Sequence, residues 1–238
     1  MLAFRTQLGD DFVEWLVALM SIITVNMLLS GDNALVIALA SRNLPPVQQK
    51  KAMIWGGAGA IGLRIVLTFV AIVLLQIPYL QLIGGLALLW IAVKLLAGED
   101  ENHELQANSN LWGAIKTIIV ADVVMSVDNV LAIAGVAKGN VTLLIIGLVI
   151  SIPIIIWGSK LINMLMERWP IIITIGAAFL GWTGGEMATG DKKIIPLLDP
   201  YPWTHWAIPI AFAVIVVFIG SLLAGRKQSG NKEPQNNL

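Results

Sequence analysis

Two short polar motifs interrupt apolar stretches of this sequence, and their residue types are those that bind cations. The first, NMLLSGDNALVIA at Asn26–Ala38, aligns without a gap with the second, DVVMSVDNVLAIA at Asp122–Ala134. The polar pairs in this alignment are Asn26 with Asp122, Ser30 with Ser126, Asp32 with Asp128, and Asn33 with Asn129. Such groups are costly in hydrocarbon unless each finds a partner, an ion or water. Their repetition indicates a functional centre rather than helix packing alone.

Every side chain in the repeated set offers an oxygen or amide group. Asn26, Ser30 and Asn33 follow one another at spacings of four and three residues, as Asp122, Ser126 and Asn129 do, so on a helix each set shares one face. An oxygen donor set suits Mn²⁺, Mg²⁺ or Ca²⁺ better than Cu⁺ or Zn²⁺, which favour sulfur or imidazole. The chain has no cysteine, and we expect both histidines, His103 and His205, in loops or at the ends of spans. Three neighbouring carboxylates repel one another without a cation, so we expect metal binding to displace a proton.

The composition places these motifs in a membrane. Apolar residues make up 57% of the chain and charged residues only 13%, and several apolar runs approach or exceed the roughly 20 residues that cross a bilayer. The lipid bilayer is therefore the expected surrounding. No basic stripe indicates nucleic-acid binding, and the N-terminus lacks the features of a removable signal peptide.

The sequence predicts an all-α polytopic membrane protein with seven transmembrane helices. The predicted spans are 12–41, 52–77, 79–97, 111–137, 141–166, 169–188 and 203–224, after a polar lead at 1–11. The first span is expected to break locally at Ser30–Gly31, which would free backbone carbonyls to line a site. The predicted domains are a first three-helix repeat (1–97), an acidic cytoplasmic linker (98–110), a second, inverted three-helix repeat (111–188), a loop and seventh helix (189–224), and a disordered tail (225–238).

The repeat extends beyond its polar core. Pro78 and Pro170 are 92 residues apart, and so are Trp90 and Trp182, whereas the polar motifs are 96 apart. Three spans followed by three spans place the second copy in the opposite orientation, an inverted repeat typical of secondary transporters with a site near mid-membrane.

Positive charges predict an N-terminus outside and a C-terminus inside. The loops after the first and fifth spans and the C-terminal tail carry Arg42, Lys50, Lys51, Arg168, Arg226, Lys227 and Lys232. The opposite side has fewer cations, and cytoplasmic loops are the ones enriched in lysine and arginine.

The two motifs, SGDNA at 30–34 and SVDNV at 126–130, together with the three-plus-three spans, resemble the TerC family of integral membrane proteins, related to the lysine-exporter superfamily. The resemblance covers roughly residues 14–224. It implies manganese export across the bacterial cytoplasmic membrane, in some members to supply enzymes outside the cytoplasm. It also implies a set of metal ligands, which are Asp32, Asn33, Asp122, Asp128 and Asn129, with Asn26 in support. The site is expected to be asymmetric, because Asn26 stands where the second motif has Asp122.

Other polar residues within or near spans are candidates for supporting roles. Arg64 lies mid-span, where an arginine needs an acidic or carbonyl partner, and it serves either a structural ion pair or control of the ion path. Lys160, one turn beyond the equivalent of Arg64, is a candidate counterpart on the same face. Lys94 and Glu186 occupy equivalent places near span ends, at the interface or at a gate. With these we group Ser30 and Ser126.

Alternative functions remain open at this stage. A carrier of an organic cation or amino acid fits the wider superfamily, but it needs a roomier cavity. An intramembrane aspartyl protease also uses two facing aspartates, yet its Gly-x-Gly-Asp and Pro-Ala-Leu motifs are missing. A metal-binding scaffold without transport is a third alternative. We expect that the protein is not an enzyme and that it binds divalent metal ions and protons. An oligomer is compatible with the sequence.

Overall fold

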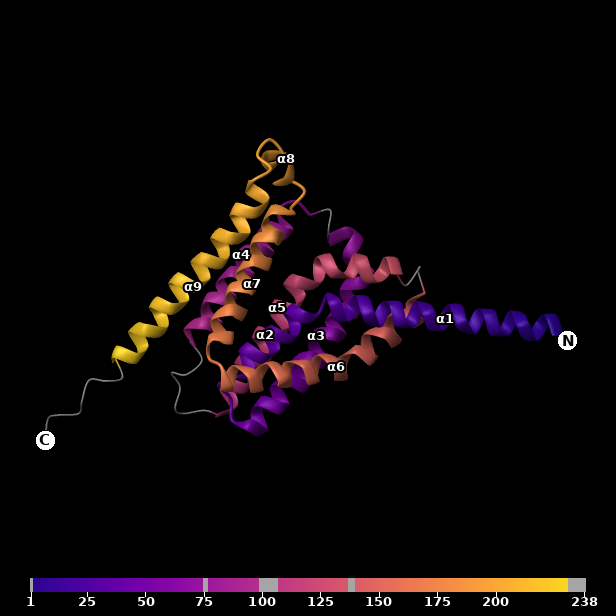
Figure 1. The fold of residues 1–238 in the computed structure, drawn as a ribbon, viewed down its shortest axis with the longest axis horizontal. Coiled ribbons are helices and arrows are strands. Elements are labelled where there is room, and N and C mark those ends of the chain that lie inside the picture. Colours follow the sequence, from indigo (N-terminus) through magenta and orange to yellow (C-terminus); the bar gives the residue numbers. More distant parts are fainter. Residues whose placement is uncertain (1, 75–76, 99–106, 137–139, 231–238) are drawn as a thin grey trace, which may run out of the picture.

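The computed structural model describes residues 2–74, 77–98, 107–136 and 140–230, with backbone only at 2–12, 14, 28, 71–73, 107–110, 127–128, 130–136 and 226–230. The described residues form helices and no strand, which confirms the all-α prediction. The helices are α1 Leu2–Leu28, α2 Gly31–Ser41, α3 Pro46–Leu74, α4 Leu80–Ala97, α5 Ala107–Val136, α6 Val141–Arg168, α7 Ile171–Thr189, α8 Ile195–Leu198 and α9 Thr204–Gly230 (Figure 1).

Most of these helices are membrane spans by length and composition. Over the described residues, α3, α4, α6, α7 and α9 are each long and apolar enough to cross a bilayer. The pair α1 and α2, bent by 47° at the break between the two helices, is a sixth candidate span if the two helices count as one. The remaining predicted span, α5, is a 30-residue helix that is not among these six. The full arrangement of seven spans therefore stays a prediction.

Several predicted boundaries were wrong because a helix does not end where hydropathy falls. Residues 2–11 and 225–230, predicted as a polar lead and a disordered tail, belong to α1 and α9. Likewise α3 begins at Pro46 rather than at 52, and α5 begins at 107 rather than at 111. Backbone hydrogen bonds continue a helix into the polar interface, and proline is well suited to a first turn. Residues 99–106 and 231–238 lie outside the described part of the chain.

Glycine residues allow α4, α7 and α9 to pack closely at one side of the molecule (Figure 1). A side chain added at Gly85 of α4 would collide with the backbone carbonyl of Gly184 on α7. On the other face of α7, Gly181 and Gly185 lie against the backbone of α9. The pair Gly181 and Gly185 therefore mediates helix packing within the chain, as its spacing predicts.

The contacts between the two halves are reciprocal. Ile22 of α1 packs against Gly147 of α6, and Ile118 of α5 packs against Gly56 of α3. Ile22 and Ile118 are 96 residues apart, as the polar motifs are, and Gly56 and Gly147 are 91 apart, one residue from the spacing of 92 found at Pro78 and Trp90, so corresponding helices of the two halves make similar contacts. This exchange is what a pseudo-twofold axis between inverted halves would produce.

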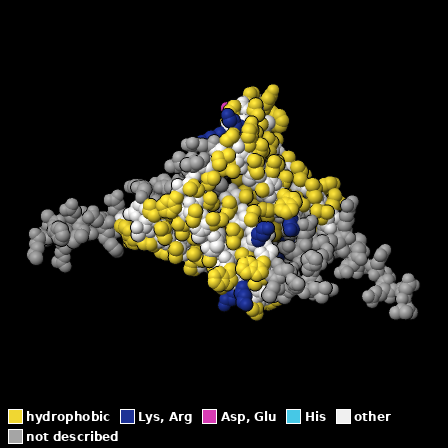
Figure 2. All heavy atoms as spheres, turned by 180° about the vertical axis from the view of Figure 1, so that it is seen from behind, with side chains coloured by type: hydrophobic (Ala, Val, Ile, Leu, Met, Phe, Trp, Pro, Cys, Tyr) yellow, Lys and Arg dark blue, Asp and Glu magenta, His cyan; other side chains and the backbone are white. Residues whose placement is uncertain are grey.

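The outer surface suits a lipid environment. Large apolar side chains are exposed along several helices, including Trp55, Phe69, Trp157 and Phe218 at 62–69% of their area. Figure 2 shows a face covered mostly by apolar side chains, with lysine and arginine confined to a few places. A bilayer would cover this surface, and the polar groups of the chain must then be satisfied inside it.

Candidate functional site

The predicted break in the first span is confirmed. α1 ends at Leu28 and α2 begins at Gly31, with Ser30 in a non-helical conformation (φ −116°, ψ 7°). The interruption releases the carbonyl of Leu29, which accepts a hydrogen bond from Asn129 Nδ2 at 3.0 Å. The equivalent part of α5 is continuous helix, with Val127 where the first motif has Gly31. The two halves therefore contribute different backbone conformations to the site.

A buried arginine occupies the place where the two polar motifs meet. Arg64 of α3 is 1% exposed, and its guanidinium reaches both α1 and α5. Toward α1, Nη1 donates to Asn26 Oδ1 at 3.1 Å and to Ser30 Oγ at 3.2 Å. Toward α5, Nε donates to Ser126 Oγ at 2.9 Å and Nη2 donates to Asp122 Oδ1 at 2.5 Å. We call these five residues the Arg64 cluster.

Hydrogen bonds within the cluster bind its oxygen atoms to one another. Ser126 Oγ donates to Asp122 Oδ2 at 3.0 Å, and Ser30 Oγ donates to Asn26 Oδ1 at 3.3 Å. Asp122 is 6% exposed, so it and Arg64 form a buried ion pair with no net charge. The planar fork of arginine, with five N–H donors, suits a ring of oxygen acceptors from two helices. In apolar surroundings this pairing is what makes a buried arginine tolerable.

Beside the cluster lies a small cavity with an unsatisfied amide. Asn33 of α2 is 4% exposed, and among the described residues neither its Oδ1 nor its Nδ2 has a hydrogen-bond partner. It lines a cavity of about 10 Å³ together with Arg64, Asp122 and mostly apolar residues of α2, α3 and α6. A volume of this size holds about one water molecule. Asn26 Nδ2 is also buried without a partner.

The aspartates of the two motifs differ in what the structure shows of them. Asp32 is half-buried, its Oδ1 accepts the backbone N–H of Asn33 at 2.8 Å, and it lies close enough to Arg64 and Asp122 to interact with their charges. The side chain of Asp128 lies outside the described part of the structure. Among the side chains that are described, no three acidic or histidine residues are grouped so as to hold a metal ion. The meeting of three carboxylates therefore stays a prediction.

The predicted supporting residues outside the cluster lie elsewhere. Lys160 is exposed on α6, and it is Ile156, 92 residues after Arg64, that lines the small cavity. Lys94 places its ammonium 5.5 Å from the centre of the Trp90 ring. Glu186 is exposed and lines a cavity of about 370 Å³ at the C-terminal end of α7, which we call the α7 end pocket. The structure brings none of these three charged residues into the Arg64 cluster.

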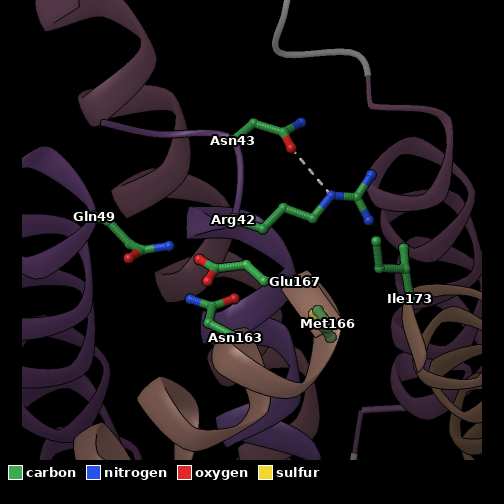
Figure 3. A pocket seen from close by; sticks show the side chains of 7 residues that line it. All are labelled: Arg42, Asn43, Gln49, Asn163, Met166, Glu167 and Ile173. Atoms are coloured by element: carbon green, nitrogen blue, oxygen red, sulfur yellow. Dashed lines mark hydrogen bonds between the residues drawn. The ribbon is translucent and has the colours of Figure 1, made fainter. Parts of the chain in front are cut away.

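A second polar pocket lies at the opposite end of α7. This cavity of about 250 Å³, the α6 end pocket, is lined by Arg42, Asn43, Gln49, Asn163, Met166, Glu167 and Ile173 (Figure 3). Asn163 and Glu167 are one turn apart on α6. Asn163 is 4% exposed and donates to Ser41 Oγ on α2 at 3.2 Å, and no described residue is a partner for its Oδ1. We did not predict this pair from the sequence, although an asparagine within the apolar run of α6 was a visible signal.

The fold and the site together define a polytopic helical membrane protein with a charged, hydrogen-bonded centre between its halves. Comparison with known proteins is more specific. The chain belongs to the integral membrane protein TerC family, whose sequence pattern matches residues 12–228.

Similar proteins are bacterial membrane proteins. The chain is 42% identical over 204 residues to the uncharacterized membrane protein YjbE of Bacillus subtilis, an alignment that covers 86% of this chain and 94% of YjbE. It is 26% identical over 249 residues to the uncharacterized membrane protein YkoY of the same organism, covering 92% and 76%. It is 27% identical over 185 residues to the inner membrane protein YgdQ of Escherichia coli, covering 70% and 77%. No solved structure matches the chain.

Proposed function

We propose that this protein is a carrier in the bacterial cytoplasmic membrane that exports a divalent metal ion, foremost Mn²⁺, in exchange for protons. The observation that carries the proposal is the ring of oxygen atoms around Arg64. Asn26, Ser30, Asp122 and Ser126 come from both halves of the chain, and all four direct an oxygen atom at one cationic group. A centre arranged in this way around a positive charge is suited to receive another cation.

The type of donor and the space available favour a small metal ion. Carboxylate, amide and hydroxyl oxygens are ligands of Mn²⁺, Mg²⁺ and Ca²⁺, so Mg²⁺ and Ca²⁺ are alternative cargoes. The cavity beside the cluster has a volume of about 10 Å³, which is far too small for an amino acid or an organic cation in this conformation. The resemblance to manganese exporters favours Mn²⁺ within this class, and metal for enzymes outside the cytoplasm is its proposed use.

The arrangement of the helices supports transport between two sides. The first span is broken beside the cluster, and the reciprocal contacts of Ile22 and Ile118 support inverted halves that move relative to each other. The α6 end pocket and the α7 end pocket lie at opposite ends of α7, where they offer polar vestibules toward the two sides of the membrane. With the N-terminus outside, the α6 end pocket faces the cytoplasm.

A protease is the weaker alternative. An aspartyl protease needs two carboxyl groups that share a proton. Here Asp122 instead accepts hydrogen bonds from Arg64 and Ser126 on both of its oxygens, as a charged carboxylate does.

The proposal is tested by manganese content and tolerance of cells that lack manganese export and carry wild-type or variant protein. We expect Asp122→Asn and Asp32→Asn to lose export, so that these cells accumulate manganese and grow poorly at high Mn²⁺. Asp191→Asn is a matched control, because Asp191 is 2% exposed and its carboxylate accepts hydrogen bonds from the backbone N–H groups of Leu82 and Lys193. Unchanged export in both Asp122→Asn and Asp32→Asn cells, with protein amounts equal to wild type, would refute the proposal.

A further inference from the structure

The Arg64 guanidinium occupies the oxygen atoms that a metal ion would need. Both oxygens of Asp122 are engaged, Oδ1 by Arg64 and Oδ2 by Ser126. Asn26 Oδ1 accepts from both Arg64 and Ser30. Ser30 and Ser126 each accept one Arg64 N–H. A metal ion that binds these four residues therefore competes with Arg64 for their oxygen atoms.

Charge leads to the same conclusion. Arg64 and Asp122 neutralise each other in a region where both side chains are at least nine-tenths buried. A dication beside the guanidinium would meet a like charge with little water to screen it. The adjoining cavity does not offer a binding site for the ion, because a hard dication needs six or more oxygen ligands and the cavity is lined mainly by apolar side chains such as Ile37, Ile61 and Ile155.

On the basis of the proposed function, we infer that Arg64 is a resident cation that the transported metal displaces from Asp122, Asn26, Ser30 and Ser126. The guanidinium binds these oxygens when no metal is present. The empty site can therefore change the side of the membrane to which it opens without leaving a buried carboxylate uncompensated. Arg64 thereby sets the metal concentration at which the site fills, and its return to the cluster drives release.

Two observations separate this role from a purely structural ion pair. The first is that the polar set is duplicated but its arginine is not, since Ile156 lies at the equivalent place in the second half. The second is that the centre is incompletely satisfied with Arg64 in place. Within the described part of the chain, Asn33 Oδ1, Asn33 Nδ2 and Asn26 Nδ2 are buried without partners, although buried polar groups are generally hydrogen-bonded. Unpartnered groups beside a satisfied ion pair indicate a centre that has a second arrangement.

The inference is tested by Mn²⁺ binding to the full-length protein in lipid nanodiscs, measured from the electron paramagnetic resonance signal of free Mn²⁺. We expect Arg64→Gln to bind Mn²⁺ about tenfold more tightly than wild type, because the competing positive charge is gone. Arg64→Lys, which keeps the charge but lacks the fork, should lie between the two. Lys160→Gln removes an exposed cation from α6 and should bind as wild type does. Both Arg64 variants should transport slowly, because the return of the unloaded carrier is impaired.

A second measurement uses the wild-type protein and needs no variant to fold. Phenylglyoxal modifies accessible arginine, and mass spectrometry reports modification of the peptide that contains Arg64. We expect Mn²⁺ to increase this modification, because the metal displaces the guanidinium from the cluster. In buffer without divalent metal, Arg64 should stay protected. Equal or weaker Mn²⁺ binding by a folded Arg64 variant, or Mn²⁺ that leaves the modification unchanged, would overturn the inference. Wild-type protein that neither binds nor transports Mn²⁺ would instead overturn the proposed function.

Discussion

The buried ion pair between Arg64 and Asp122 gives the sharpest test of the structure. Asp122→Asn keeps the shape of the side chain but removes its charge, so Arg64, 1% exposed, is left without a counter-ion. Removal of one partner of a buried pair costs about 3–5 kcal/mol. For a chain of this size that corresponds to a fall in melting temperature of roughly 6–20 °C.

The assay is thermal unfolding of the purified protein, and the decisive variant is a double one. Arg64→Leu with Asp122→Leu removes both charges together, and replacement of a buried pair by apolar residues is often close to neutral. We therefore expect the double variant to be more stable than either Asp122→Leu or Arg64→Leu, with a coupling free energy of about 3 kcal/mol, the upper end of what neighbouring residues show.

Asp191→Asn is the matched control for loss of a buried carboxylate. Its oxygens accept backbone N–H groups of Leu82 and Lys193, so its replacement should cost about 1–2 kcal/mol, and simultaneous loss of Arg64 should add to that cost independently. Strictly additive effects for Arg64→Leu and Asp122→Leu would refute the ion pair as the organising contact of the centre.

Three further outcomes are expected. Gly85→Ala should destabilise the protein by about 1–3 kcal/mol in thermal unfolding, because the added methyl meets the Gly184 backbone, whereas Gly62→Ala, with open space around it, should not. Asn163→Leu should lose the hydrogen bond to Ser41, which is worth about 0.6 kcal/mol in a membrane interior. If the α6 end pocket is a vestibule, the same variant should slow Mn²⁺ transport by more than this small loss of stability explains. In inside-out vesicles, an acidic lumen should accelerate Mn²⁺ uptake, because protons leave as the metal enters; uptake that ignores the imposed pH gradient would contradict proton exchange.

Local features of the chain were predictable from the sequence. The apolar runs predict spans, Ser30–Gly31 predicts the broken first span, and Gly181 with Gly185 predicts a close helix contact. Each of these depends on neighbouring residues, on the length of a hydrophobic stretch or on the missing side chain of glycine, and such properties are present in the chain before it folds.

The sequence also predicted four of the five residues of the Arg64 cluster as part of a polar centre. The repeat of Asn26 with Asp122 and of Ser30 with Ser126 identified the side chains that meet, because polar groups in lipid must find partners within the protein. The interaction partner of that set was not predictable in the same way, since Arg64 comes from a third helix and has no copy in the second half.

Only the tertiary structure decided where the charges lie. It placed Arg64 between α1 and α5, left Lys160 exposed on the same helix that carries Ile156 into the cavity, and joined Asn163 to Ser41 across 122 residues. These outcomes depend on the rotation and crossing of packed helices, where one residue further along a helix turns a side chain by about 100° from the core toward the lipid. Hydropathy and motif spacing predict which residues share a face of each helix. Which faces contact each other is set by how the helices pack.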